Sequence, residues 1–341
     1  MPDYSFIIVS WNARAYLRQC LDSIKTESKG LEVEVIVIDN ASSDGSPEMV
    51  QAEYPWVVLI RNDSNVGFAR ANNQGIAVSS AKYLCLVNSD VVIHPGCLIE
   101  MKDFLDTNPQ IGLAGPKVLN SDGTLQSSCR ETPTLRSVLF RALALDTLFP
   151  RSSTFGAHYM TNWEHDDVRV VGILGGCCWF ARRLAVEEVG GLNEAFFMYG
   201  EDMEWCLRFS RRGWPVVYNP VATITHYGGA SSSRQPTRFF IEMQRADLQY
   251  WRMHHGLPTF ITYYVAVVLE HACRVAGHSV LWLVRPSSRA QSAAKVEGSV
   301  ACLVRLLTLQ LTAATPPQKS APPTPPNSTP SPAAPANFWS W

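Results

Sequence analysis

Short apolar runs recur along the first ninety residues and alternate with stretches that have a helical spacing of apolar positions. The runs lack helical period and predict buried strands at residues 5–9, 32–38, 56–60 and 83–87. The intervening stretches predict helices at residues 14–24, from Pro47 onward and at 72–80. This alternation predicts an α/β fold with a mainly parallel sheet covered by helices on both faces.

Each of the four predicted strands ends in polar residues. The endings are Ser10-Trp11-Asn12, Asp39-Asn40, Arg61-Asn62-Asp63 and Asn88-Ser89-Asp90. A single polar ending of this kind is expected of any loop that follows a strand. In parallel sheets, however, ligands bind beyond the carboxyl ends of the strands, so four polar endings in succession predict a binding site.

The pattern is less regular between residues 112 and 229. Single strands are predicted at 112–119 and 170–181, a helix at 201–211 that Gly213 ends, and two short strands at 216–218 and 222–225.

The C-terminal third has a different character. Residues 238–251 predict a helix, and residues 260–284 are strongly apolar but interrupted by charged residues. Glu270, Arg274 and His278 recur at spacings of four and share one helix face, which favours an amphipathic helix over a spanning one. Two interpretations stay open: a helix on a membrane surface, or a helix packed on the rest of the chain. Residues 313–341, rich in Pro, Ser, Thr and Ala, are expected to be disordered.

Composition narrows the function classes. The net charge of −1 gives no indication of nucleic-acid binding. Charged residues are only 17% of the chain, which leaves surface for lipid or a partner. The nine cysteines are scattered without a Cys-x-x-Cys pair, which is typical of reduced thiols in a cytosolic protein. The first residues do not match a secretory signal, so we expect a cytoplasmic location.

Candidate chemistry in the first half centres on the strand endings. Asp90 could bind Mg²⁺ or Mn²⁺, which commonly bridges carboxylates and substrate phosphates, although a plain turn is the alternative. Asp39 could accept hydrogen bonds from a base or ribose. Arg70, in the stretch after Asn65, could pair with a phosphate, or it could be a solvated helix residue.

In the second half, Glu201 and Asp202 stand at a predicted helix start, where the helix dipole favours an ionised carboxylate. Such a carboxylate is a candidate general base, and helix capping is the alternative. His226 follows a strand-like run and is a candidate metal ligand or a packed histidine. The chain contains no Rossmann or Walker A motif, which disfavours dinucleotide and P-loop enzymes.

Five stretches together resemble a known family. They are IIVSWNARAYLRQCLDSI, VEVIVIDNASSDGS, NVGFARANNQGI, YLCLVNSDVVIHPG and FFMYGEDMEWCLRFSRRGW. In this order, over residues 5–230, the chain resembles the family 2 inverting glycosyltransferases with the type-A fold, especially the rhamnosyltransferase-like branch. The C-terminal third lies outside the resemblance.

The resemblance implies a metal-dependent hexosyltransferase of cell-envelope polysaccharide biosynthesis. It implies a nucleotide-diphosphate sugar donor, dTDP-rhamnose first and a UDP-sugar next, with Asp39 at the base. Asp90 would hold the Mg²⁺ or Mn²⁺ as the last residue of an Asp-x-Asp motif in which Asn88 replaces the first Asp. Asp202 would be the catalytic base and His226 a second metal ligand.

The remaining site residues follow from the same resemblance. The donor-binding set is Ser10, Trp11, Asn12, Asp39, Asn40, Asn65, Arg70, Asn88 and Ser89. The acceptor would lie near Gly175, Gly176 and Tyr199, and Glu201 would assist Asp202.

We therefore expect four regions. Residues 1–115 would bind the donor, 116–230 would bind the acceptor and carry catalysis, and 231–312 would form a helical extension, with 313–341 as the tail. The acceptor would be a saccharide or a polyprenyl-linked saccharide, with peripheral contact to the cytoplasmic face of the membrane. The alternatives are an inactive sugar-nucleotide-binding scaffold and a nucleotidyltransferase, although the glycine-rich phosphate loop of the latter is not visible after Val9.

Overall fold

The computed structural model describes residues 1–228 and 236–308. The expected boundary at 230/231 and the expected tail at 313–341 lie outside these residues. The strands are β1 Tyr4–Ser10, β2 Val33–Asp39, β3 Val58–Arg61, β4 Tyr83–Asn88, β5 Val91–Ile93, β6 Leu113–Leu119, β7 Cys129–Arg130, β8 Arg169–Val170, β9 Ile173–Leu174, β10 Cys178–Arg182 and β11 Val216–His226. The helices are α1 Arg14–Glu27, α2 Ser46–Glu53, α3 Phe68–Val78, α4 Cys97–Thr107, α5 Leu135–Ala142, α6 Leu145–Leu148, α7 Arg183–Val189, α8 Glu201–Arg211, α9 Pro236–His254, α10 Leu257–Val284, the 3₁₀ turn η1 Pro286–Ser288 and α11 Arg289–Leu307.

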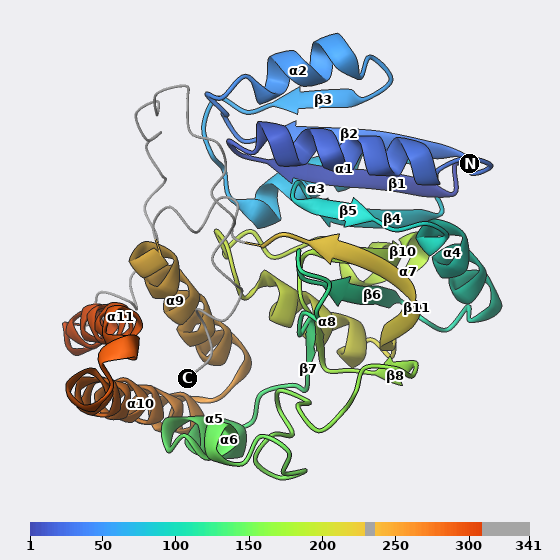
Figure 1. Cartoon of the computed structure of the whole chain (residues 1–341). Helices are drawn as coiled ribbons and strands as arrows, with labels where there is room; N and C mark the ends of the chain where they lie inside the picture. The colour runs from blue at the N-terminus through green and yellow to red at the C-terminus, as the bar shows by residue number, and fades with distance from the viewer. Residues whose placement is uncertain (229–235, 309–341) are drawn as a thin grey trace.

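One large sheet organises the chain, with strand order β3-β2-β1-β4-β10-β6-β11-β5 (Figure 1). β1 to β4 are mutually parallel where they pair, whereas β10 runs antiparallel to both β4 and β6. The sheet is therefore mixed but mainly parallel, with helices on its faces and a helical C-terminal region. The predicted fold class is confirmed.

The alternation of side chains along β1 explains how the sheet is covered. Phe6 and Ile8 join the buried cluster that includes apolar residues of α1, α2 and α4. Ile7, which points to the opposite face, joins the cluster that includes residues of α3 and α8. Because both faces are covered, the middle of β1, from Phe6 to Val9, is apolar, and Ser10 ends the strand.

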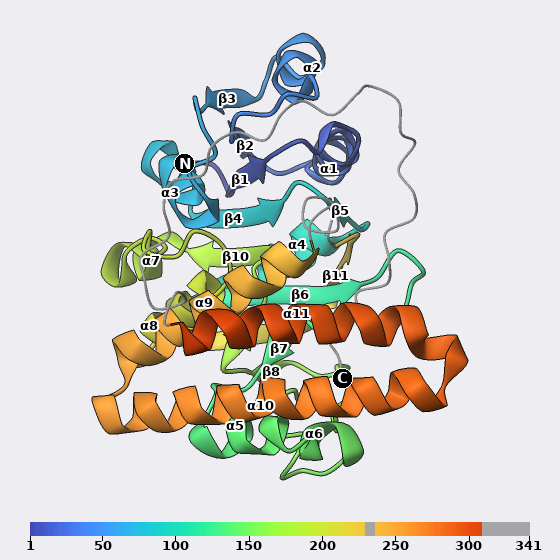
Figure 2. The ribbon, with the colours of Figure 1, turned by 90° about the vertical axis from the view of Figure 1, so that its left-hand side faces the viewer.

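Helices α9, α10 and α11 form a layer beside the sheet, and α10 runs alongside α11 with α5 against it (Figure 2). Here the polar face of α10 is the buried one. Glu270, His271, Arg274 and His278 are each at most 7% exposed. Apolar side chains of the same helix face outward: Leu257, Ile261, Val265, Leu269, Val280, Trp282, Leu283 and Val284.

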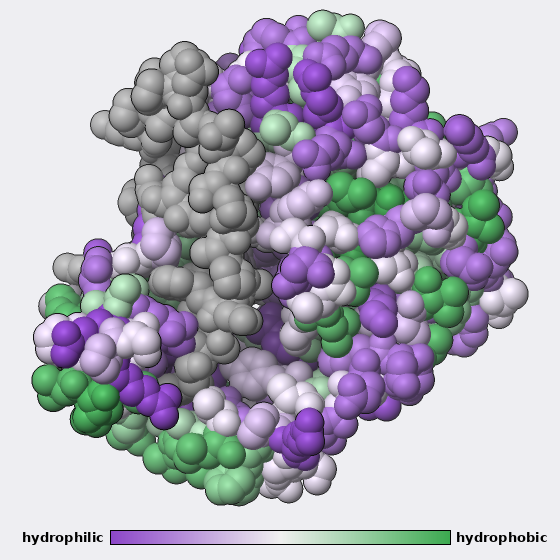
Figure 3. Space-filling model, viewed as in Figure 1, coloured by the Kyte–Doolittle hydropathy of each residue, from purple (hydrophilic) through white to green (hydrophobic). Residues whose placement is uncertain are grey.

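Apolar surface consequently gathers over α10, α5 and α6 along the lower left of the molecule (Figure 3). By length and composition alone α10 could cross a membrane, yet its charged residues lie inside the protein. The helix packs on the domain and also exposes an apolar face, so neither of the two interpretations left open by the sequence describes it fully.

Four predicted strands differ from the structure. Residues 170–181 belong to three short strands instead of one, because each piece pairs with different strands: β8 with β11, β9 with β7, and β10 with β4 and β6. The two strands predicted within residues 216–225 are one strand, β11, with an irregular register between Asn219 and Thr223. The third predicted strand begins at Val58 instead of Trp56, because the Val57 amide closes a turn onto Tyr54.

Candidate active site

The polar strand endings lie at one edge of the sheet. In the parallel register Ser10 is opposite Asp39, and Val9 is opposite Asn88. Asp39 is 2% exposed, and its Oδ2 accepts from the Ser42 amide at 2.9 Å. Its Oδ1 is buried and has no partner among the residues described. Burial raises the pKa of Asp39. An unsatisfied buried acceptor is costly, so this oxygen suits a donor group on a ligand.

The loops after β1 and β2 hold each other in place. The Asn12 amide donates to Ser42 Oγ at 2.9 Å, and Asn12 Oδ1 accepts from the Ser43 amide at 2.7 Å. Asn12 has φ of 51°, in the left-handed region that asparagine tolerates. Trp11 precedes it and is partly exposed. The structure thus joins the predicted residues of these two loops into one surface.

The start of α3 connects the predicted donor residues to the second half of the chain. The Gly67 amide donates to Asn65 Oδ1 at 3.0 Å, and Asn40 Nδ2 donates to the Gly67 carbonyl at 3.3 Å. Gly67 has φ of 89°, and an added Cβ would lie 2.6 Å from the Phe197 carbonyl oxygen, so only glycine fits. Arg70 is exposed on the first turn of α3 and makes no hydrogen bond or ion pair to the described residues.

Asp90 and His226 lie together although 136 positions separate them in the sequence. His226 Nε2 is 3.3 Å from Asp90 Oδ1, and Asn88 Nδ2 is 3.4 Å from the same nitrogen. The backbone explains the meeting, because β11 pairs with β5 through His226 and Val91. Ser89, between Asn88 and Asp90, is 8% exposed.

Gln126, which the sequence analysis missed, orients this histidine. Its Oε1 is 2.7 Å from His226 Nδ1, and its Nε2 donates to the His226 carbonyl at 3.1 Å. The two contacts fix the amide orientation and put the proton on Nδ1. Nε2 then offers a lone pair beside Asp90 Oδ1 at 3.3 Å and the Asn88 amide at 3.4 Å, and an imidazole nitrogen this close to a carboxylate oxygen is suited to share a cation with it.

These groups fit a divalent cation held mainly by its substrate. Residues 1–228 and 236–308 contain no group of three or more His, Cys, Asp and Glu side chains that could hold a metal. Asp90 and His226 supply one carboxylate oxygen and one imidazole nitrogen. Mg²⁺ typically takes one or two protein ligands in addition to phosphate oxygens and water, so the small ligand set fits.

Asp202 lies in the first turn of α8, after Gly200 with φ of 77°. Its Oδ1 accepts from the Met203 amide at 2.7 Å, and its Oδ2 is 3.5 Å from Arg130 Nη2. The adjacent Glu201 is 5% exposed, with Oε2 buried and without a hydrogen-bond partner among the described residues. Burial, with a smaller effect from Asp202, raises the pKa of Glu201 to about 8.

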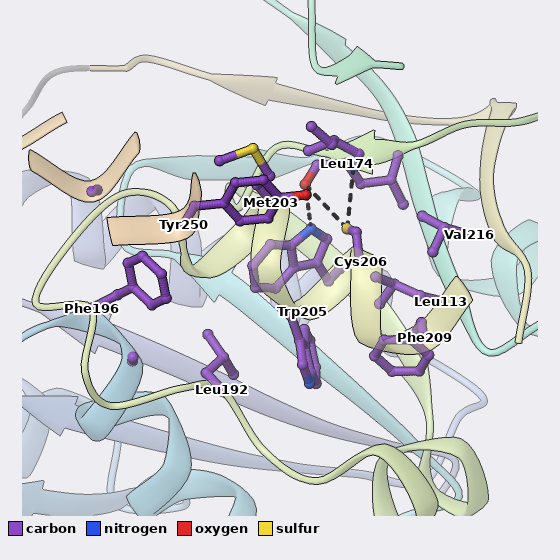
Figure 4. Close-up of a cluster of buried hydrophobic side chains, with 14 of the residues drawn as sticks. Leu113, Leu174, Leu192, Phe196, Met203, Trp205, Cys206, Phe209, Val216 and Tyr250 are labelled. Carbon is purple, nitrogen blue, oxygen red and sulfur yellow. Dashed lines mark hydrogen bonds between the residues drawn. The ribbon is translucent and has the colours of Figure 1, made fainter. Parts of the chain in front are cut away.

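The two carboxyl groups therefore differ in environment. Glu201 is favoured as a neutral acid at pH 7, whereas Asp202 is accessible at a helix N-terminus beside a guanidinium group. Side chains on the buried side of α8 hold this turn in place, since Trp205, Cys206 and Phe209 pack among the residues of the core cluster (Figure 4).

The predicted acceptor residues contact three different parts of the chain. The Gly175 amide donates to the Ser128 carbonyl at 2.6 Å. An added Cβ on Gly176 would be 3.3 Å from the Trp179 ring and 3.8 Å from Phe68 of α3. Tyr199 has φ of 66°, and its ring meets Phe239 of α9 edge-on at 6.3 Å.

One short segment contacts both carboxylate centres. Gln126 binds His226, which lies against Asp90, and Arg130 lies against Asp202. Because four residues span at most about 14 Å, the Cα atoms of Gln126 and Arg130 lie within that distance of each other. The residues that contact the two carboxylate centres are therefore close together. Neither Gln126 nor Arg130 stands in a periodic pattern, and only a family motif could have indicated them. The catalytic, donor, acceptor and metal roles named above stay predictions.

Comparisons with known proteins agree with this architecture. The glycosyl transferase family 2 model matches residues 5–190. The N-acetylglucosaminyl-diphospho-decaprenol L-rhamnosyltransferase of Mycobacterium tuberculosis is 30% identical over 241 residues, which cover 67% of this chain and 78% of that protein. The low-salt glycan biosynthesis hexosyltransferase Agl10 of Haloferax volcanii is 26% identical over 231 residues, covering 66% of this chain and 67% of its own length.

A solved structure extends the likeness to the fold. The mannosyltransferase of Pyrobaculum calidifontis, in complex with GDP-Man and Mn²⁺, superposes with a TM-score of 0.54 at 17% identity. The match covers 90% of this chain and 89% of that one. At this identity the similarity shows the fold alone.

Proposed function

Because this chain belongs to glycosyltransferase family 2, in its rhamnosyltransferase-like part, we propose that it transfers a sugar from a nucleotide-diphosphate donor to a saccharide hydroxyl with inversion at the anomeric carbon. Sugar transfer itself follows from the family. Rhamnose is the favoured sugar and dTDP-rhamnose the favoured donor, because the Mycobacterium tuberculosis relative is named a rhamnosyltransferase. UDP-sugars are the next candidates.

The unpaired, buried Oδ1 of Asp39 is the observation that carries the donor proposal. A nucleotide base or ribose offers N–H or O–H groups that would satisfy this oxygen. Asn12, whose loop is bonded to the loop after Asp39, would line the same pocket. Arg70, exposed at the start of α3, would pair with a phosphate.

Asp90 and His226 would hold Mg²⁺ or Mn²⁺. The facing lone pairs at 3.3 Å support this assignment, as does the Mn²⁺ in the mannosyltransferase structure. A bound cation would supply charge neutralisation for the departing nucleotide diphosphate. Asn88 has a neutral amide where the family's Asp-x-Asp motif has its first aspartate. The motif in this chain therefore brings one negative charge to the cation, that of Asp90, instead of two.

Asp202 would remove the proton from the acceptor hydroxyl as that oxygen attacks the anomeric carbon. The bond to the diphosphate oxygen breaks as the new glycosidic bond forms, and the proton stays on Asp202. A single displacement needs no enzyme nucleophile. The raised pKa of Glu201 supports a division of labour in which Asp202 is the base and Glu201 stays neutral.

We further propose a lipid-linked acceptor at the cytoplasmic membrane surface. The Mycobacterium tuberculosis relative is named for a lipid-linked acceptor, N-acetylglucosaminyl-diphospho-decaprenol, and the exposed apolar face of α10 offers a surface for lipid. Over its 28 residues, all of which the structure describes, α10 exposes no charged side chain. Exposed arginines flank the helix, Arg252 before it and Arg285 and Arg289 after it, which suits an anionic bilayer.

Nucleotide release tests the proposal directly. The full chain is incubated with dTDP-rhamnose and a panel of UDP-sugars, with and without Mn²⁺, and with the lipid-linked acceptor. We expect one donor to give metal-dependent release that Asp39→Asn strongly reduces. Thermal stabilisation by donors without turnover would favour the inactive scaffold, and release of pyrophosphate from nucleoside triphosphates would favour a nucleotidyltransferase.

A further inference from the structure

A cleft opens next to Asp202, and its lining does not include Asp39, Asp90 or His226. It contains about 420 Å³ of space, part of it open to solvent. Helices α5, α9 and α10 and the start of α8 line it, through Arg130, Ser137, Arg141, His158, Met203 and Asp247 among others. Met203 directly follows Asp202, and Arg130 contacts its carboxylate, so the cleft adjoins the proposed catalytic base.

Two arginines line this cleft with unused donors. Arg141 uses Nε for Glu270 at 2.9 Å and Nη1 for Tyr159 at 3.4 Å, which leaves its Nη2 without a hydrogen bond to the described residues. The guanidinium of Arg130 has one polar contact among the described residues, the 3.5 Å pair with Asp202, and this side chain is 40% exposed. Planar guanidinium groups with free N–H donors are suited to phosphate oxygens.

Carboxyl groups also lie near these two arginines, and Asp202 contacts Arg130. Glu270 is shared between Arg141 and Arg274, which lies 3.6 Å from it. Burial raises the pKa of Asp247 to about 6, so this carboxyl group still carries its negative charge at pH 7 and loses it only in mildly acidic solution. Burial lowers the pKa of His158 to about 3, and its Nδ1 has no partner among residues 1–228 and 236–308. His158 is therefore a neutral side chain with an unpaired ring nitrogen.

Helix α5 connects the cleft to the apolar surface. Ser137 and Arg141 of this helix face the cleft, whereas Leu139 and Leu143 are 41% and 53% exposed. The neighbouring α10, which packs against α5, exposes Val265. A molecule in this cleft would have a base at one end, cations in the middle and an apolar surface at the other.

We propose that this cleft binds the diphosphate of a lipid-linked acceptor, with Arg130 and Arg141 donating to its oxygens. The sugar then lies at Asp202 and the polyprenyl chain leaves over α5 and α10. This assignment rests on the proposed function. It also keeps the two diphosphates of the reaction apart. The diphosphate of the donor would lie at Asp90 and His226, whereas the diphosphate of the acceptor would be bound by the two arginines.

Direct binding tests the site separately from transfer. The full chain is titrated calorimetrically, in EDTA and below micelle-forming concentrations, with an N-acetylglucosaminyl diphosphate carrying a farnesyl chain. Farnesyl N-acetylglucosaminide, which lacks the diphosphate, is the matched ligand. EDTA prevents the diphosphate from binding through a cation at Asp90. The variants are Arg130→Gln and Arg141→Lys, and Arg136→Gln, an exposed arginine on α5, is the control.

We expect the wild type to bind the diphosphate ligand at least about tenfold more tightly than the phosphate-free ligand. Each variant should lose about tenfold or more for the diphosphate ligand only, and Arg136→Gln should lose nothing. Unchanged binding in both variants, or an equal loss for both ligands, would overturn the site. If Arg141→Lys unfolds, Arg130→Gln decides, because its side chain is partly exposed. Absence of sugar transfer by a wild type that binds the diphosphate would contradict the proposed function and leave this site standing.

Discussion

The donor edge of the sheet and the C-terminal helical layer distribute polarity in opposite ways. At the donor edge, apolar strands are buried, and the polar residues that end them, such as Asp39 and Asn88, lie at the same carboxyl edge of the sheet. In the layer, α10 buries Glu270 and Arg274 against its neighbours and exposes side chains such as Val265 and Leu283.

The difference indicates that the two regions contact two different kinds of molecule. Polar groups at the edge of an apolar sheet suit a small charged ligand delivered from water. A helix that pairs its charges internally and exposes apolar side chains is stable only because Glu270 has Arg141 and Arg274 as partners, and its outer face suits an apolar environment. The proposed reaction needs both, since it joins a water-soluble donor to a lipid-linked acceptor.

Removing the central buried charge should break the layer. Glu270→Ala leaves Arg141 and Arg274 without their carboxylate, and the free energy of unfolding should fall by about 3–5 kcal/mol in urea titrations. The matched control is Glu297→Gln on the exposed side of α11, expected within about 0.5 kcal/mol of wild type. A loss below about 1 kcal/mol in Glu270→Ala would mean that the buried pairs do not hold the layer together.

At the site between the two regions, Asp202→Asn should lower turnover by about 10²-fold or more, because the acceptor proton loses its base. Donor affinity, measured by thermal shift, should be retained because the donor edge is untouched. Asp63→Asn, an exposed carboxylate after β3, serves as the control. Normal turnover of Asp202→Asn would remove this residue from the role of base.

The donor edge can be weakened without touching a proposed ligand. Gln126→Leu removes the acceptor that holds the Nδ1 proton of His226, and the apparent affinity for Mn²⁺ should fall by about 10–100-fold. High Mn²⁺ should restore turnover. Gln110→Leu, on an exposed loop, should leave the Mn²⁺ dependence unchanged. An identical Mn²⁺ titration for Gln126→Leu would argue against His226 as a ligand.

The buried carboxyl next to Asp202 should give the protein a distinctive pH dependence. The pKa of Glu201 is about 8 when folded against an ordinary value of 4.5, so the folded state holds this proton longer than the unfolded state. Its contribution to stability is present below about pH 4.5 and is lost as the pH rises toward 8.

Glu201→Gln removes this titration. Relative to wild type, the melting temperature of the variant should rise between pH 5 and pH 8 by about 2–4 °C or more. Differential scanning calorimetry across this range measures it, with Glu187→Gln on the exposed side of α7 as the control. A melting-temperature difference that does not vary with pH would place the Glu201 carboxyl in a polar environment.

The smallest effect on stability is expected at the outer face of the layer. Val265→Glu and Leu283→Glu should change the free energy of unfolding by no more than about 0.5 kcal/mol, because both side chains are more than half exposed. Binding to anionic vesicles should nevertheless weaken about tenfold, since burying one such side chain in lipid contributes about 1.5–3 kcal/mol.

Val58→Glu on the edge strand β3 is the control for charge, because Val58 is 54% exposed and lies in the other region. Equal vesicle binding by Val265→Glu, Leu283→Glu and wild type would contradict lipid contact through α10.

The sequence alone predicted the strands that line the donor edge and the helix at 201–211, because these signals are local. For example, the apolar run at residues 83–87 predicts a buried strand, and Asn88-Ser89-Asp90 directly after it predicts where that strand ends. The order of the polar endings, together with the family resemblance, placed the candidate residues on both sides of the site.

Only the tertiary structure decided which groups meet and which face of a helix is covered. The contact of Gln126 with His226 spans 100 positions, and that of Arg130 with Asp202 spans 72. Periodicity shows that α10 has a polar and an apolar face, but it carries no information about which face its neighbours bury. That depended on Arg141 of α5, distant in sequence, supplying the partner that makes a buried Glu270 stable.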